Sequence, residues 1–101
     1  MYLQKFEIKN KIALVTGAGK GIGKASAIAL AEAGADLIIL SRTKSDLDKV
    51  KKHVVKLRRN CQSYVCDVSN YDEVKSVFKE IKKIDILITN KIKIFLCYFS
   101  I

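Results

Sequence analysis

Four glycines and two lysines lie close together in the segment Val15–Ser26, VTGAGKGIGKAS. Glycine lets a backbone turn tightly and approach an anion closely, and a helix that begins at such a turn directs its free amides at that anion. The segment therefore predicts a phosphate-binding loop. Two kinds of loop have this chemistry, one for nucleoside triphosphates and one for dinucleotides.

The spacing of the residues separates these two kinds of loop. A triphosphate loop needs a glycine five positions before its Gly-Lys pair and a hydroxyl directly after the pair. Counted from Gly23 and Lys24, these positions hold Ala18 and Ala25. Both requirements fail, so the sequence does not favour a triphosphate site.

The dinucleotide pattern needs glycines at a turn from a buried strand into an amphipathic helix. The sequence offers Gly17, Gly19, Gly21 and Gly23 at such a turn. We expect a helix to begin near Gly21 and to point its amides and positive dipole end at the phosphates. The alternative, a glycine-rich turn without a ligand, is less favoured because the strand and helix context is satisfied.

The elements that position this loop are four short apolar segments separated by three helical ones. Consecutive apolar residues predict strands buried on both faces over residues 12–16, 36–41, 62–66 and 84–89. Helical spacing of apolar residues predicts a helix between each pair of strands, with these buried stripes: Ile22, Ala25, Ala29, Ala33; Leu47, Val50, Val54, Leu57; Val74, Val77, Phe78, Ile81. Capping boxes are expected at Thr43–Asp46 and Ser69–Asp72, and Gly34 suits a helix end.

Strand and helix alternate throughout, and this pattern is typical of the α/β class. Right-handed crossovers then favour a partial Rossmann-type, doubly wound parallel sheet of four strands in the order 3-2-1-4 with three helices. We expect residues 1–90 to form this half of a dinucleotide-binding domain. Residues 91–101, KIKIFLCYFSI, have a different composition and are expected to be an apolar tail left by truncation or a frameshift, or alternatively a final strand.

The chain of 101 residues has a formal net charge of +9, which comes mostly from lysine. Such a balance suits either a nucleic-acid-binding module or a solvated lysine surface. Most lysines lie opposite predicted apolar stripes, without interleaved aromatic residues, so the solvated surface is favoured and no nucleic-acid partner is expected.

Three cysteines, Cys61, Cys66 and Cys97, show neither disulfide nor metal-ligand spacing. They predict free thiols in a reducing cytoplasm and no metal site. No signal peptide or membrane-spanning segment is evident, so no membrane partner is expected.

Three ordered motifs carry a resemblance to a known family. KNKIALVTGAGKGIGKASAIALAEAGADLIILSR, then CDVSN, then IDILITN resemble the N-terminal half of a short-chain dehydrogenase/reductase over Phe6–Asn90. The resemblance implies an oxidoreductase that interconverts carbonyls and secondary alcohols, and the overall likeness is greatest to the 3-oxoacyl-[acyl-carrier-protein] reductase type. Members of the family are usually oligomeric, but the segment that forms the interface lies outside the resemblance.

The resemblance also implies cofactor-binding roles for particular residues. Asp67 and Val68 would lie beside the adenine ring. Asn90 matches the first residue of the family's Asn-Ala-Gly motif, although Lys91 and Ile92 break that motif at once. The family's TGxxxGIG loop corresponds to Thr16, Gly17, Gly21, Ile22 and Gly23, with Gly19 and Lys20 inside it.

The residue type at the end of the second strand indicates which nicotinamide cofactor is preferred. An NAD site has an acidic residue there, which binds the ribose hydroxyls and repels a 2′-phosphate. This sequence has Ser41 followed by Arg42, and Lys20 in the glycine loop adds a second cation. Because both cations attract a phosphate dianion, the sequence predicts NADP(H) rather than NAD(H).

No catalytic residue is assigned in these 101 residues. In the family the proton donor is a tyrosine with a lysine four residues later, and a serine and an asparagine complete the site, all beyond the fourth strand. The one such spacing here, Tyr71 and Lys75, opens the helix after the third strand, and His53 stands alone on a polar helix face. A dinucleotide-binding fragment without turnover is therefore the alternative to an active oxidoreductase.

Overall fold

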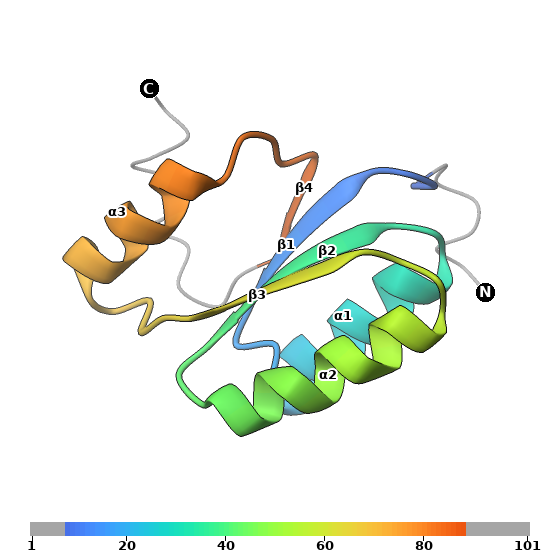
Figure 1. The fold of residues 1–101 in the computed structure, drawn as a ribbon, viewed down its shortest axis with the longest axis horizontal. Helices are drawn as coiled ribbons and strands as arrows, with labels where there is room; N and C mark the ends of the chain where they lie inside the picture. The colour runs from blue at the N-terminus through green and yellow to red at the C-terminus, as the bar shows by residue number, and fades with distance from the viewer. Residues whose placement is uncertain (1–7, 89–101) are drawn as a thin grey trace.

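A computed structural model describes residues 8–88 of the chain. Strands β1 (Ile12–Thr16), β2 (Asp36–Ser41), β3 (Cys61–Val65) and β4 (Ile86–Ile88) alternate with helices α1 (Gly21–Glu32), α2 (Lys44–Lys56) and α3 (Tyr71–Glu80). The strands form one parallel sheet in the order β3-β2-β1-β4 (Figure 1). The predicted fold class, strand order and number of helices are confirmed.

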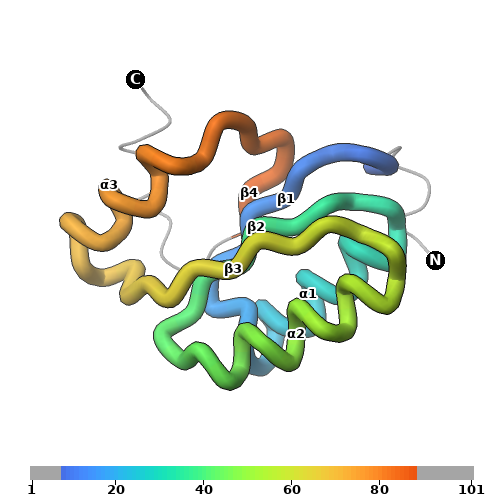
Figure 2. The backbone as a smooth tube through the Cα atoms, in the orientation of Figure 1, coloured from blue at the N-terminus to red at the C-terminus, as the bar shows by residue number. Residues whose placement is uncertain are grey.

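The sheet is covered on both faces (Figures 1 and 2). Helices α1 and α2 lie on one face and α3 on the other. Alternate residues of a strand point to opposite faces, so Val15 and Ile39 pack in the core under α1 and α2, whereas Leu14 and Leu40 pack under α3. Both sets are buried, which explains why apolar residues are consecutive in these strands, and each side chain of this size contributes about 1.5–3 kcal/mol.

Two strands have bounds different from those predicted. β3 begins at Cys61 and ends at Val65, one residue earlier than expected, because Cys61 pairs with Leu37 in the ladder. β4 begins only at Ile86, because Asp85 contacts Ile12 through its side chain as well as its backbone. The expected end of this strand, residue 89, lies outside the described residues.

The buried face of α1 is not the predicted one. Ile22 is 80% exposed and Ala25 is also exposed, whereas the buried residues are Gly23, Ala27, Leu30 and Ala31. Apolar residues lie on all sides of this helix, so their spacing does not define a single stripe. The helix is instead oriented by the contact of Gly23 with the backbone of the preceding loop.

The other helix predictions are largely confirmed. Leu47, Val50 and Val54 of α2 are buried, as are Val74 and Val77 of α3. Past the end of α1, Gly34 adopts φ +104°, and Gly34 and Ala35 donate to the carbonyls of Ala31 and Leu30. This is the Schellman arrangement that ends a helix at glycine.

Both predicted capping boxes are wrong in detail. Thr43 precedes α2, but its side chain makes no capping hydrogen bond, and Asp46 turns toward Lys20 instead. At α3 the capping residue is Asn70, whose Oδ1 accepts from the Glu73 amide at 3.2 Å. Ser69 does not cap because it donates to Asp67.

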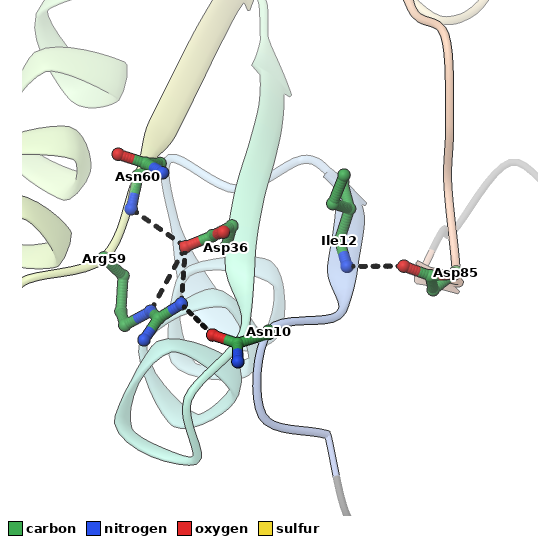
Figure 3. Close-up of polar contacts among 6 residues, drawn as sticks. All are labelled: Asn10, Ile12, Asp36, Arg59, Asn60 and Asp85. Atoms are coloured by element: carbon green, nitrogen blue, oxygen red, sulfur yellow. Dashed lines mark hydrogen bonds and ion pairs between the residues drawn. The ribbon is translucent and has the colours of Figure 1, made fainter.

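A polar cluster joins the amino ends of β1, β2 and β3 (Figure 3). Asp36 Oδ1 accepts hydrogen bonds from Arg59 Nε at 3.1 Å, from Arg59 Nη2 at 2.9 Å and from the Asn60 amide at 3.0 Å. Arg59 Nη2 also donates to Asn10 Oδ1. Since the Asp36 and Arg59 side chains are only 24% and 20% exposed, the pair is partly shielded from solvent and fixes the segment after α2 to β2.

Replacing Asp36 by alanine is expected to lower the free energy of unfolding by about 1–3 kcal/mol, because the half-buried guanidinium of Arg59 loses its carboxylate. Urea unfolding measures the loss. The control is Asp48→Ala, which removes an exposed ion pair with Lys44 and is expected to change stability by less than about 0.5 kcal/mol. Equal losses in the two variants would contradict a structural role for the cluster.

Replacing Gly23 by alanine is expected to lower the free energy of unfolding by about 3 kcal/mol. The new Cβ would overlap the Gly17 carbonyl oxygen and lie 2.7 Å from the Gly17 carbonyl carbon, where only backbone could give way. In the matched variant, Gly21→Ala, the Cβ enters open space and only the positive φ of +56° opposes it, at about 1 kcal/mol. Thermal or urea unfolding that ranks Gly21→Ala as the more damaging change would refute this packing argument.

Candidate functional site

A cleft of about 310 Å³ lies at the carboxyl ends of β1, β2 and β3. In an open parallel sheet this edge is where ligands bind. Three segments line the cleft: the end of β1 with the loop after it (Thr16, Gly17, Gly19, Lys20), the end of β2 with the start of α2 (Ser41, Arg42, Thr43, Asp46), and the segment after β3 (Cys66, Asp67, Val68, Ser69).

The loop after β1 brings the first turn of α1 to the cleft. Gly17 has φ +61° and Gly21 has φ +56°, conformations that favour glycine. Lys20 is the N-cap with an extended backbone, its side chain makes no capping hydrogen bond, and the first turn of α1 holds no acidic residue. The positive end of the helix dipole is thus not neutralised by its own helix, and it suits an anionic ligand.

Two cations, Lys20 and Arg42, and the carboxylate of Asp46 line the cleft. The side chain of Lys20 is 82% exposed, and its Nζ lies 3.8 Å from Asp46 Oδ2. Arg42 is exposed as well and lines the same cleft from the end of β2. Ser41 Oγ accepts from the Thr43 amide at 3.3 Å, which fixes the turn between β2 and α2. This arrangement places both positive side chains where a phosphate group could reach them.

The segment after β3 supplies a further wall of the cleft. Asp67 Oδ1 accepts from the Ser69 amide at 3.0 Å and from Ser69 Oγ at 2.6 Å, while the Asp67 amide donates to Glu73 Oε1. The carboxylate therefore orders the turn that leads into α3. Val68, half-buried beside it, adds apolar surface to the cleft, of the kind against which a flat ring can pack.

Cys66 also lines the cleft, at the point where β3 ends. Burial raises the pKa of its thiol, and the nearby carboxylates of Glu73 and Asp67 raise it further. The thiol is thus protonated at neutral pH, which makes it a weak nucleophile. Its role in the cleft is packing, and it is not a candidate for covalent chemistry.

Eight of the predicted site residues line the cleft: Thr16, Gly17, Gly19, Lys20, Ser41, Arg42, Asp67 and Val68. Gly21, Ile22 and Gly23 form the first turn of α1 and are not among the lining residues, and Asn90 lies outside the described residues. The sequence interpretation missed Thr43, Asp46, Cys66 and Ser69 as lining residues. The available signal was the position of Thr43, Cys66 and Ser69 just after strand ends, but Thr43, Asp46 and Ser69 were interpreted as members of the two capping boxes.

Tyr71 and His53, which the sequence analysis did not assign as catalytic, are not among the residues that line the cleft. Tyr71 begins α3, is 57% exposed and does not line the cleft. His53 is exposed on α2. Within residues 8–88, no three His, Cys, Asp or Glu side chains gather as metal ligands would, and no helix is long and apolar enough to span a bilayer.

Curated proteins with similar sequences are oxidoreductases by name. The 2-dehydro-3-deoxy-D-gluconate 5-dehydrogenase of Pseudoalteromonas atlantica is 45% identical over 93 residues, which cover 87% of this chain and 37% of that protein. The L-xylulose reductase of Mus musculus is 35% identical over 78 residues, or 77% of this chain and 30% of that protein. The chain therefore spans about a third of the length of these relatives.

Solved structures give the same result for the fold. NAD⁺-bound xylitol dehydrogenase superposes with a TM-score of 0.72 at 38% identity, over 80% of this chain and 33% of that one. L-Sorbose reductase from Gluconobacter frateurii, in complex with NADPH and L-sorbose, has a TM-score of 0.73 at 28% identity. The match covers 82% of this chain and 34% of that one. Such neighbours include complexes with both forms of the nicotinamide cofactor.

The family model for short chain dehydrogenases matches residues 11–91, which include all four strands and the glycine loop. With relatives of this identity and neighbours of this fold, the chain belongs to the short-chain dehydrogenase family.

Proposed function

We propose that this chain binds NADP(H) through the cleft at the carboxyl ends of β1, β2 and β3 and forms the cofactor half of a short-chain oxidoreductase. The observation that carries the proposal is the convergence of an uncapped helix N-terminus with Lys20 and Arg42 on one cleft. Backbone amides of the loop and of the first turn of α1 would face the diphosphate. The two cations would face the 2′-phosphate.

The residues that are present fit such a cofactor. Gly17 and Gly19 line the cleft without side chains, and a Cβ at Gly19 would come within 2.7 Å of Asp46 Cβ, so backbone borders the cleft at these two positions. Exposed backbone of this kind allows a diphosphate to approach closely. Asp67 and Val68, on the wall after β3, would contact the adenosine end, and Asn90 would follow the fourth strand.

When bound, the nicotinamide supplies the hydride that interconverts a carbonyl and a secondary alcohol. This chain's own residues would hold and orient the cofactor. The family's proton donor corresponds to no assigned residue in these 101 positions, so we expect the chain by itself to bind NADPH without oxidising it. We also propose a cytoplasmic location for the protein. Cys61 and Cys66 are free thiols, and free thiols are typical of proteins in a reducing compartment.

Two substrate classes are candidates for the whole protein. The overall resemblance in sequence suggests a 3-oxoacyl-[acyl-carrier-protein] reductase. The names of similar proteins favour a polyhydroxylated carbonyl compound or alcohol, since they include a dehydrogenase of a deoxygluconate, a xylulose reductase and a xylitol dehydrogenase. We propose the polyhydroxylated class, because the names of these three similar proteins favour it.

Calorimetric or fluorescence titration with NADPH and NADH tests the cofactor proposal. NADPH is expected to bind more tightly, and Arg42→Ala is expected to weaken NADPH binding by about tenfold with little effect on NADH, because only NADPH carries the 2′-phosphate. The control is Lys52→Ala, which removes the same charge from an exposed position of α2 outside the cleft. Tighter binding of NADH would overturn the preference, and failure to bind either dinucleotide would overturn the function.

A further inference from the structure

Asp46 is a carboxylate built into the wall of the proposed cofactor cleft. It lies in the first turn of α2, and its side chain is 18% exposed, whereas that of its partner Lys20 is 82% exposed. The loop packs against it at Gly19, where a Cβ would lie 2.7 Å from Asp46 Cβ and 3.1 Å from Ser41 Oγ. Asp46 is therefore held by packing, and Lys20 is the more exposed member of the pair.

The charged residues near Asp46 suggest that its carboxylate affects the binding of an anion in the cleft. Four of the described residues that line the cleft are charged: Lys20, Arg42, Asp46 and Asp67. The Asp67 carboxylate already accepts two hydrogen bonds from Ser69 and orders the turn before α3. Asp46, by contrast, forms an ion pair with Lys20, which is one of the two cations proposed to hold the 2′-phosphate.

The Asp46 carboxylate would weaken the binding of a 2′-phosphate in this cleft in two ways. The carboxylate repels the dianion directly, and it competes with the phosphate for the ammonium of Lys20. NAD(H) lacks this phosphate, and its diphosphate is proposed to face the backbone amides of the loop. A carboxylate can also accept a hydrogen bond from a ribose hydroxyl. The charge on Asp46 would thus oppose the binding of NADP(H) more than that of NAD(H).

We propose that Asp46 is a specificity-determining residue that limits the preference for NADP(H) by holding Lys20 and opposing the 2′-phosphate. This inference rests on the proposed function of the cleft. It assigns to α2 an acidic group that acts on the cofactor choice in place of the carboxylate that β2 lacks at Ser41.

The test compares Asp46→Asn with the wild-type chain by titration with NADPH, NADH, 2′,5′-ADP and 5′-AMP. Affinity for NADPH and 2′,5′-ADP is expected to rise by about three- to tenfold, while affinity for NADH and 5′-AMP stays constant. Asp48→Asn is the matched control, because it removes the same charge from an exposed position of α2 whose partner, Lys44, does not line the cleft. It is expected to leave all four affinities unchanged.

A double-mutant cycle examines the competition for Lys20. Lys20→Met is expected to weaken NADPH binding more in the Asp46→Asn background than in the wild-type background, since the ammonium is then available to the phosphate alone. Should Asp46→Asn fold poorly, Asp46→Ser removes the charge and keeps a residue suited to a helix start. Circular dichroism of each variant checks folding before titration.

The outcomes separate this inference from the proposed function. If wild-type protein binds neither dinucleotide, the proposed function fails. If it binds them and the ratio of NADPH to NADH affinity is unchanged or lower in Asp46→Asn and Asp46→Ser, the role of Asp46 is wrong while the function stands. A gain in affinity for NADPH and 2′,5′-ADP alone supports the proposed role of Asp46.

Discussion

The close approach of helix α1 to the loop after β1 is the contact on which the site depends. Gly23 lies against the carbonyl of Gly17 with no room for a side chain between them. The contact directs the first turn of α1 toward the cleft at the carboxyl end of β1. It also determines which residues of the helix are buried, because Ala27, Leu30 and Ala31 follow Gly23 at helical spacing.

The parallel sheet adds the second condition, since it brings three segments that are far apart in sequence to one edge. The register pairs Val15 with Ile39 and Leu40 with Tyr64, so β1, β2 and β3 end side by side. Lys20, Arg42 and Asp67 thereby line one cleft although more than twenty residues separate each from the next. At the opposite edge, the contacts of Asp36 with Arg59 and Asn60 hold the amino ends of β2 and β3 together (Figure 3).

The positive and negative side chains that line the cleft are more evenly balanced than the net charge of +9 for the whole chain suggests. Of the thirteen lysines within residues 8–88, eight lie on exposed helix positions and do not line the cleft. The cleft is lined by two positive and two negative side chains among the described residues, and the ion pair of Lys20 with Asp46 joins the glycine loop to α2. Local charge at the end of β2, rather than the charge of the whole chain, is therefore the property that bears on the choice of cofactor.

The fold class, the strand order, the glycine loop and eight of the residues that line the cleft could be predicted from the sequence, because each depends on local pattern. Consecutive apolar residues mark strands buried on two faces, and glycines at a strand end mark a turn into a helix. The buried face of α1, the caps of α2 and α3, and the place of Asp46 in the cleft could not be predicted in this way. Ile22 is apolar yet exposed, and Asp46 in the first turn of α2 forms an ion pair with Lys20 of the glycine loop, because contacts between distant segments outweigh local preference. The sequence by itself determined which elements form and where the glycine loop lies between them. Only the tertiary structure decided which side chains share the cleft, since packing of α1 and α2 against the same sheet brings their charged residues within reach of each other.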